Sequence, residues 1–312
     1  MTKPARAAAL LLLVALPFFV TSCDSSGASS RARDGSLRIV ATIGMIGDVA
    51  SRIAKQDAHV DAMMGPGVDP HLYKATEGDI RRLTEADLIL YNGLNLEGKM
   101  GDILVKVGRS RPVVAVSESV PENLLREPPE FAGHYDPHIW FDVSLWAMTI
   151  DPIVRELSSL DPDRAAEYRR NGEALKKELL DLDAWVASEI ASIPKERRVL
   201  VTAHDAFGYF GERYGIEVKG LQGISTVAEA GLADVERLVE TVVSRKVPAI
   251  FVESSVPRRA IEAVQKACES RGHSVKIGGE LFSDAMGAAD SPEGTYPGMV
   301  RHNVRTIVEA LR

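Results

Sequence analysis

Three histidines and one aspartate follow predicted strands in a pattern that suggests metal ligation. His71 ends segment 65–71, His138 lies in the run DPHIWFD at 136–142, and His204 directly follows an apolar run. Asp284 lies in a loop after a further short apolar run. Imidazole nitrogens with one carboxylate suit a borderline divalent transition metal such as zinc, which binds nitrogen at about 2.0 to 2.1 Å.

Two of these histidines follow the dipeptide Asp-Pro, at positions 69–71 and 136–138. Proline fixes its own φ and biases the preceding residue toward an extended shape, so each imidazole leaves a stiff backbone. A single histidine of this kind is better explained as a hydrogen-bonded core or loop residue. Three histidines and a carboxylate at strand ends in both halves of the chain favour a metal site.

Other polar residues near these positions have different expected roles. Metal-bound imidazoles usually donate their second N–H to a carboxylate or carbonyl, and Asp136, Asp205 and Glu253 are candidates for that role. His134 is expected to face solvent, although it lies four residues before His138. The remaining histidines are expected to be surface or packing residues: His59, His273 and His302.

Strand-like and helix-like segments alternate along the chain, which predicts an α/β fold with parallel sheets and helical crossovers. Strands are expected at 37–42, 60–64, 88–91, 113–116, 199–202, 216–218, 249–252 and 275–277. Helices are expected at 46–54, 77–85, 100–107, 207–214, 235–243, through Val264, and at 299–311. Ligands of such sheets bind beyond the carboxyl ends of the strands, where the candidate ligands lie.

A long amphipathic helix is predicted in the middle of the chain, at 161–194. Asp161 can cap it and Pro162 suits the first helical position. At 1.5 Å per residue the helix would span about 45 to 50 Å, with Gly172 as its weak interior position. We expect it to be a rigid link between an N-terminal lobe at 36–160 and a C-terminal lobe at 195–312, each with a mostly parallel sheet flanked by helices.

The N-terminus has the features of a secretory signal. Lys3 and Arg6 precede an apolar run that is too short to span a membrane. Residues 20–23, VTSC, resemble a bacterial lipobox, which predicts a signal peptide at 1–22, lipidation of Cys23 and a flexible tether at 23–35. The chain would then be extracytoplasmic and lipid-anchored at the periplasmic side or cell surface. The alternative is an ordinary signal peptide that happens to contain a cysteine.

Charge and cysteine content exclude several classes. The formal net charge of −7 gives no reason to expect a nucleic-acid partner. The chain has only 2 cysteines, so there is no disulfide framework and no thiolate cluster for structural zinc. Cys268 lies on a helix-like apolar run and is expected to be a buried apolar residue.

Four segments together resemble one known family. They are DPHLY at 69–73, DPHIWFD at 136–142, VTAHDAFGYF at 201–210 and GGELFSD at 278–284. They are similar, in the same order, to segments of the zinc- and manganese-binding lipoproteins of bacterial ABC importers, the cluster A-I group, and most closely to its TroA-like members. The resemblance covers nearly all of the chain after the signal.

This resemblance implies a binding protein that is not an enzyme. It would hold one divalent ion as cargo with His71, His138, His204 and Asp284, and deliver it to a membrane permease with its cytoplasmic ATPase. Manganese-dedicated members tend to have glutamate at the position of His204, so histidine favours zinc or mixed zinc and manganese use, with iron as a further candidate. The chain lacks the long His- and Asp-rich loop of many zinc-dedicated members, and a monomer is expected.

Three other functions remain as alternatives. An iron-chelate or vitamin-binding protein could share the helix-joined architecture, but it would need an aromatic or arginine-lined cleft. A zinc hydrolase would need an open metal position and a general base, and no His-Glu-x-x-His motif occurs. An adhesin would be favoured by a large apolar stripe, which the sequence lacks.

Overall fold

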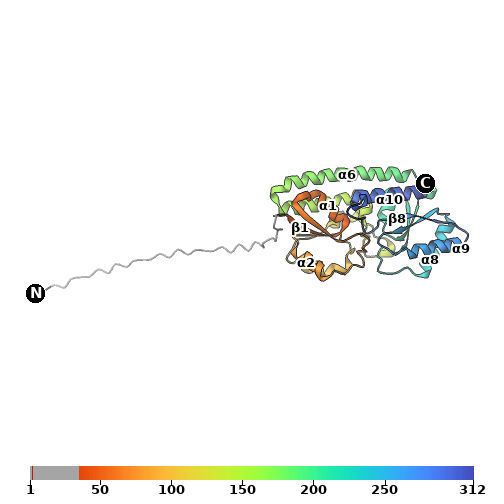
Figure 1. The fold of residues 1–312 in the computed structure, drawn as a ribbon, viewed down its shortest axis with the longest axis horizontal. Coiled ribbons are helices and arrows are strands. Elements are labelled where there is room, and N and C mark those ends of the chain that lie inside the picture. Colours follow the sequence, from red (N-terminus) through yellow and green to blue (C-terminus); the bar gives the residue numbers. More distant parts are fainter. Residues whose placement is uncertain (1, 3–34) are drawn as a thin grey trace.

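The computed structural model describes residue 2 and residues 35–312. The predicted signal peptide and the tether, including Cys23, fall outside the described residues apart from Thr2 and Gly35. Figure 1 shows an elongated body in which one long helix, α6, runs along one side over both halves of the chain. None of the described helices is both long and apolar enough to span a membrane.

The N-terminal half contains a four-stranded, all-parallel sheet in the order β2-β1-β3-β4. Apolar side chains dominate β1, where only Arg38 is not buried, because helices cover the faces of the sheet and β2 and β3 flank β1 on either side. The strands are β1 (Leu37–Ile43), β2 (Ala58–Met64), β3 (Leu88–Tyr91) and β4 (Val113–Ala115). The crossover helices are α1 (Gly44–Ala54), α2 (Glu77–Glu85) and α3 (Gly101–Val107).

The C-terminal half has two parallel strand pairs, β5-β6 and β7-β8, where one mostly parallel sheet was expected. Strands β5 and β7 still lie against each other. The strands are β5 (Val199–His204), β6 (Glu217–Gln222), β7 (Ala249–Glu253) and β8 (Lys276–Leu281). The helices are α7 (Gly208–Tyr214), α8 (Leu232–Ser244), α9 (Arg259–Ser270) and α10 (Tyr296–Leu311). The prediction of an α/β fold with parallel strands flanked by helices is confirmed.

The linking helix α6 (Ala165–Ala191) is shorter at both ends than the predicted helix at 161–194. Asp161 does not cap it: its carboxylate binds Arg164 Nη1 at 2.7 Å, and residues Pro162–Arg164 form a separate 3-10 turn. The 27 residues of α6 correspond to about 40 Å. It packs against α1 from one half and α10 from the other (Figure 1).

Two helices before α6 were not expected from the sequence, α4 (Val143–Trp146) and α5 (Ile150–Leu160). Pro152 lies in the first turn of α5, where a missing N–H costs no helical hydrogen bond. Short 3-10 turns complete the chain at Lys55–Asp57, Gly98–Met100, Val116–Ser119, Glu122–Leu124, Pro129–Phe131, Ile139–Phe141, Ala147–Thr149, Lys195–Arg197 and Pro292–Gly294.

The hydrophobic core is not divided at the boundary between the halves. One cluster of buried side chains runs from β1 through α6 to α10, for example from Ile39 through Leu182 to Ile307. A second, smaller cluster lies among the C-terminal strands and helices, and it includes Cys268, which is fully buried as predicted. Because the large cluster continues through both halves, their relative motion would disturb packed side chains.

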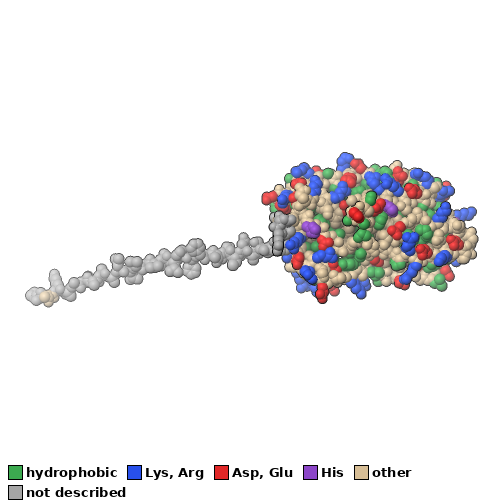
Figure 2. Space-filling view, viewed as in Figure 1, with side chains coloured by type: hydrophobic (Ala, Val, Ile, Leu, Met, Phe, Trp, Pro, Cys, Tyr) green, Lys and Arg blue, Asp and Glu red, His purple; other side chains and the backbone are tan. Residues whose placement is uncertain are grey.

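The face of the body that Figure 2 shows is mixed in charge. On the face shown in Figure 2, Lys and Arg side chains are interspersed with Asp and Glu side chains. This face therefore offers no broad basic area of the kind that binds nucleic acid.

Candidate metal centre

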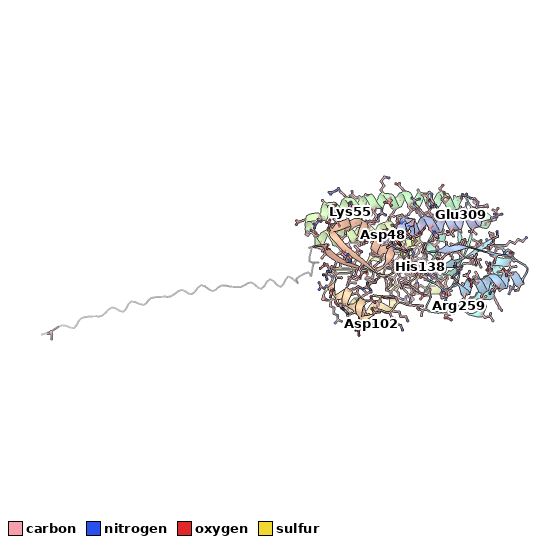
Figure 3. The ribbon with its side chains drawn as sticks, in the orientation of Figure 1. Asp48, Lys55, Asp102, His138, Arg259 and Glu309 are labelled. Atoms are coloured by element: carbon pink, nitrogen blue, oxygen red, sulfur yellow. The ribbon has the colours of Figure 1, made fainter. Side chains whose placement is uncertain are left out.

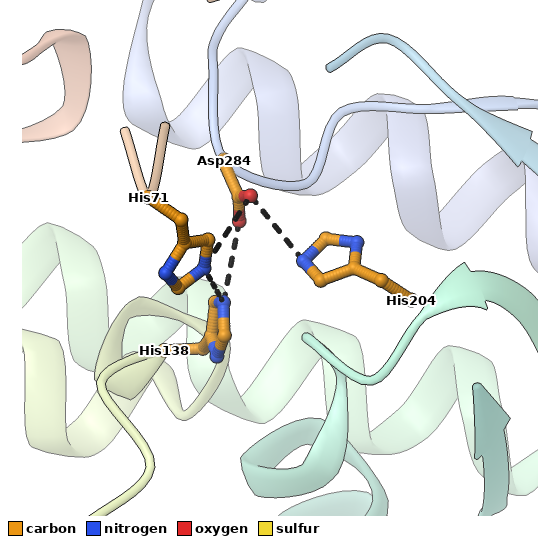
Figure 4. A group of neighbouring side chains, drawn as sticks. All are labelled: His71, His138, His204 and Asp284. Atoms are coloured by element: carbon orange, nitrogen blue, oxygen red, sulfur yellow. Dashed lines mark hydrogen bonds and ion pairs between the residues drawn. The ribbon is translucent and has the colours of Figure 1, made fainter. Parts of the chain in front are cut away.

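The four side chains singled out in the sequence meet inside the molecule. Each of His71, His138, His204 and Asp284 offers one nitrogen or oxygen atom, and these atoms all lie within 4.8 Å of one another (Figure 4). All four residues are buried, with His71 the most exposed at 4%. Figure 3 places His138 near the middle of the body, between Lys55 toward one end and Arg259 toward the other.

Each half of the chain contributes two of these side chains. His71 lies in the loop after β2, and His138 directly precedes the 3-10 turn Ile139–Phe141. His204 is the last residue of β5, and Asp284 follows β8. Three of the four thus lie at or after the carboxyl end of a strand, as expected for ligand sites in such sheets, whereas His138 lies in the long segment between β4 and α4.

Distances within the cluster match those between ligands of a single ion. His204 Nε2 lies 3.3 Å from Asp284 Oδ2, and His138 Nε2 lies 3.4 Å from Asp284 Oδ1. His71 Nε2 lies 3.3 Å from His138 Nε2 and 3.9 Å from Asp284 Oδ2. Two ligands that each bind an ion at about 2.1 Å stand about 3.4 Å apart in tetrahedral geometry. The shorter of these separations fit an ion held by the three Nε2 atoms and the carboxylate of Asp284.

Three polar atoms of the cluster lack a hydrogen-bond partner within the described part of the chain. They are Nε2 of His204 and both carboxylate oxygens of Asp284. A buried carboxylate without partners is costly, because its lost hydration is not replaced. A cation at the centre would satisfy all three atoms.

Two carboxylates contact the Nδ1 atoms of two of the imidazoles, those of His138 and His204. Asp136 Oδ1 lies 2.7 Å from His138 Nδ1 and also accepts the His138 backbone N–H at 3.0 Å. Glu253 Oε2 contacts His204 Nδ1, and its Oε1 accepts the His204 backbone N–H at 2.8 Å. Both carboxylates are buried, so each leaves the inner Nε2 of its histidine facing the cluster.

The third imidazole has a different support, which the sequence analysis missed. Asp69 Oδ1 accepts the backbone N–H of His71 at 2.9 Å, and Asp69 Oδ2 accepts the hydroxyl of Thr226 at 2.6 Å. This links the His71 loop to the C-terminal half. The signal was present, because Asp69 and Asp136 both stand two residues before a ligand candidate. Asp205, in contrast, forms no hydrogen bond with a cluster imidazole among the described residues.

The other histidines lie away from the cluster. His134 and His59 are exposed. His273 Nε2 binds the carbonyl of Val247 at 2.9 Å, and His302 Nε2 binds that of Glu280 at 3.0 Å. Their environments match the predicted surface and packing roles.

The electrostatics of the cluster favour positive charge beside Asp284. Burial lowers the pKa of His71 to about 3. Burial also opposes charge on His138, but the hydrogen bond and charge of Asp136 outweigh it and raise the pKa of His138 to about 9. Burial likewise acts against charge on His204, yet Glu253 and Asp284 raise its pKa well above the ordinary value.

Asp284 itself stays ionised in this environment. Burial raises its pKa, but the neighbouring charge of His204 and the nearby His138 imidazole outweigh burial and hold the pKa well below the usual range. The negative charge is thus fixed at the centre of the molecule. Protons on the imidazoles or a divalent ion can balance it.

Comparison with known proteins decides the family. The family model described as "Zinc-uptake complex component A periplasmic", ZnuA, matches residues 39–310. The chain belongs to this family. The resemblance expected from the four sequence segments is therefore confirmed, and it extends over nearly all of the described chain.

Two relatives of this ZnuA-family chain are similar over almost their full lengths. It is 51% identical to the zinc-binding protein TroA of Treponema pallidum, over 96% of each chain. It is 47% identical to the manganese-binding lipoprotein MntA of Bacillus subtilis, over 95% of this chain and 96% of the relative. The structure of the periplasmic zinc-binding TroA from Treponema pallidum superposes with a TM-score of 0.87, at 53% identity, covering 89% of this chain and 99% of that one.

Proposed function

We propose that this chain captures one divalent transition-metal ion outside the cytoplasm and delivers it to the permease of an ABC importer. The cargo would be Zn²⁺ or Mn²⁺, with Fe²⁺ as a further candidate. The observation that carries the proposal is the buried cluster of three imidazoles and one carboxylate whose oxygens have no hydrogen-bond partner among the described residues. The zinc-binding and manganese-binding relatives support it.

The ligands would be His71, His138, His204 and Asp284. Asp136 and Glu253 would orient two of the imidazoles and keep their inner nitrogens available to the ion. Three nitrogen ligands and one oxygen ligand give zinc the higher intrinsic affinity over manganese. Affinity does not set the cargo in the cell, where metal availability also acts.

Two further parts of the proposal concern location and assembly. The lipobox-like residues 20–23 would place a lipid on Cys23, and 23–35 would tether the body to the membrane. The ABC permease and its cytoplasmic ATPase would be the partners, and the chain would act as a monomer of two lobes, 36–160 and 195–312. Manganese-binding relatives described as lipoproteins support the anchor.

The geometry supports capture over hydrolysis. A catalytic zinc keeps one position open for water, whereas four protein side chains converge here and none is more than 4% exposed. An iron chelate or a vitamin would need a larger open cleft than a cluster whose ligand atoms lie within 4.8 Å. The family and relatives found are binding and uptake proteins, which also favours capture.

Calorimetric titration of the purified, metal-free protein with Zn²⁺ and Mn²⁺ tests this function. We expect one ion per chain, with zinc the tighter. Affinity should fall as pH drops below about 9, because His138, whose pKa is about 9, then takes up a proton that competes with the ion. His134→Ala, which changes an exposed histidine outside the cluster, should titrate as the parent does. No saturable binding of either ion would refute the proposal.

A further inference from the structure

Arg126 connects the metal cluster to a helix of the opposite half. It lies in the N-terminal half, between the 3-10 turns Glu122–Leu124 and Pro129–Phe131. Its side chain is 16% exposed and reaches α7 in the C-terminal half, where Nε donates to Glu212 Oε1 at 2.6 Å. Its guanidinium also lies over the ring of Tyr209, 5.6 Å from the ring centre.

The other end of the guanidinium binds the carboxylate that supports His138. Nη1 of Arg126 pairs with Asp136 Oδ2, while Asp136 Oδ1 holds the Nδ1 and the backbone N–H of His138. Asp136 is fully buried, so Arg126 supplies the only countercharge at its outer oxygen among the contacts described. A continuous chain of contacts therefore runs from α7 through Arg126 and Asp136 to His138.

Backbone contacts hold the same junction together. The hydroxyl of Tyr209 accepts the Arg126 backbone N–H at 3.0 Å and donates to the Asp136 carbonyl at 3.0 Å. The Asp136 backbone N–H donates to the Arg126 carbonyl at 2.8 Å. Both side-chain and backbone groups of the loop before His138 thus contact α7.

Gly208, the first residue of α7, leaves the space that the guanidinium fills. A Cβ at this position would lie 1.7 Å from Arg126 Nη1 and 2.4 Å from Arg126 Cζ. The three nearest atoms all belong to the guanidinium of Arg126, so an alanine would first displace the end of one flexible side chain. This gives a way to move Arg126 without changing any charged residue.

We propose that Arg126 is a positioning residue for the metal centre. It holds Asp136, and through it His138, in the geometry that binds the ion only while α7 of the other half is in place. The proposal rests on the proposed function, because it takes His138 as a ligand. Of the two carboxylates that Arg126 binds, Glu212 is accessible, with its side chain 67% exposed, whereas Asp136 is buried.

The test is the rate at which zinc-loaded protein loses Zn²⁺ to an excess of a chromogenic chelator. Removing a group that orients a ligand typically costs 10- to 100-fold in metal affinity, so we expect Arg126→Gln to speed zinc loss about tenfold. Gly208→Ala should speed it similarly, and the double variant should be no faster than either single one. Arg126→Lys should restore part of the retention, because lysine returns the charge without the two-pronged geometry.

A spectroscopic readout separates positioning from general destabilisation. In protein loaded with Co²⁺, the visible absorption bands should shift in Arg126→Gln and in Gly208→Ala. Arg164→Gln is the control: it also removes an arginine paired with two largely buried carboxylates, Asp57 and Asp161, and these pairs include no residue of the cluster. The control should leave both the rate of zinc loss and the cobalt spectrum unchanged.

The outcomes distinguish this inference from the function on which it rests. A parent protein that binds no zinc or cobalt overturns both. A parent that binds zinc normally, with Gly208→Ala and Arg126→Gln losing it at the parental rate, overturns the positioning role and leaves the function intact. Equal acceleration in Arg164→Gln would also overturn it, because the effect would then be one of stability.

Discussion

At the residue scale, the two Asp-Pro-His segments share one backbone hydrogen bond but differ in the second contact of the aspartate. Asp69 and Asp136 each accept the N–H of the histidine two residues later, at 2.9 and 3.0 Å. Asp136 also holds the imidazole of His138, whereas Asp69 turns its second oxygen to Thr226. The motif fixes the backbone in both places, and the surrounding fold decides what else the carboxylate does.

Glu253→Gln tests how much the orientation of one imidazole contributes to metal binding. The two oxygens of Glu253 now contact the Nδ1 and the backbone N–H of His204, and both of these groups need an acceptor. The amide of glutamine has only one acceptor oxygen, so its NH₂ group would face one of them. We expect zinc affinity to fall about 10- to 100-fold, measured by competition with a chelator of known affinity. Stoichiometry should stay at one ion per chain, because all four proposed ligands remain.

Glu280→Gln is a suitable control for this variant, because Glu280 lies on the neighbouring strand β8 and is exposed. It should bind zinc as the parent does. Parental affinity in Glu253→Gln would show that the His204 imidazole needs no carboxylate, and would contradict the role assigned here.

The candidate ligands were predictable from the sequence, but their supports were only partly so. Ligand types at strand ends are a local pattern, and all four meet in the structure. Of the three proposed supporting carboxylates, Asp136 and Glu253 contact imidazoles, while Asp205 does not. Asp69 was missed although it stands two residues before His71, whereas Arg126 was missed because its partner Glu212 is distant in sequence and meets it only through the fold.

At the element scale, α6 depends on a glycine where α5 crosses it. A Cβ at Gly172 would lie 2.6 Å from Val154 Cγ2 and 3.2 Å from Ile150 Cγ2. The sequence marked Gly172 as a weak point of the helix, since glycine is a poor helix former. The structure shows that two side chains of α5 occupy the space where a Cβ at Gly172 would lie.

Gly172→Ala should therefore destabilise the protein although alanine favours helix. The gain in helix propensity is about 1 kcal/mol, while overpacking typically costs about 1 to 3 kcal/mol. We expect a net loss of about 1 kcal/mol, measured by chemical denaturation. Adding Val154→Ala should recover stability by opening the space. A Gly172→Ala protein more stable than the parent would contradict the packing argument.

The start of α2 provides a pH-dependent contribution to stability. Thr76 and Asp79 form a capping box, and Asp79 also binds the hydroxyl of Tyr73 at 2.7 Å and pairs with Arg82. Burial raises the pKa of Asp79, but hydrogen bonds from the Thr76 backbone, Tyr73 and Arg82 outweigh it and hold the pKa well below the ordinary value of 3.8. A carboxyl group whose pKa is lower in the folded than in the unfolded state stabilises the fold at pH values above the unfolded-state pKa. This stabilisation is lost as pH falls from the unfolded-state pKa through the folded-state pKa.

Asp79→Asn should lower the free energy of unfolding by about 1 to 3 kcal/mol at neutral pH, since a buried charged hydrogen-bond acceptor is lost. The difference from the parent should shrink as pH falls below about 4, where the parental carboxyl loses its advantage. Denaturant titrations at neutral and acidic pH measure this. Asp102→Asn, in the first turn of α3 but exposed, should change little. An equal loss of stability at both pH values would contradict this role for the charge of Asp79.

At the scale of the whole molecule, the two halves behave as one packed body around a buried site. The alternation of strands and helices and the linking helix were predictable, because they follow from local periodicity. The continuous core through α6 and α10 was not, since it depends on packing between residues that are far apart in the sequence. Helices α4 and α5 were missed because Pro152 and short apolar runs hide their pattern in the sequence.

The shared core bears on how an ion is released. Each half supplies two of the four proposed ligands. The hydrogen bond between Asp69 and Thr226 and the ion pair between Arg126 and Glu212 join the halves close to the site. A wide opening of the halves would break these contacts and disturb the core. We therefore expect small displacements of the ligand loops on docking to the permease, in place of a large hinge motion.

The most direct test of the account is the metal content of the purified chain and of variants from each half. Elemental analysis should find about one zinc or manganese ion per chain in the parent and in His134→Ala, and much less in both His138→Ala and His204→Ala. That result would establish a single site built from both halves. A parent without metal even after loading, or a variant of either half that retains the ion fully, would contradict it.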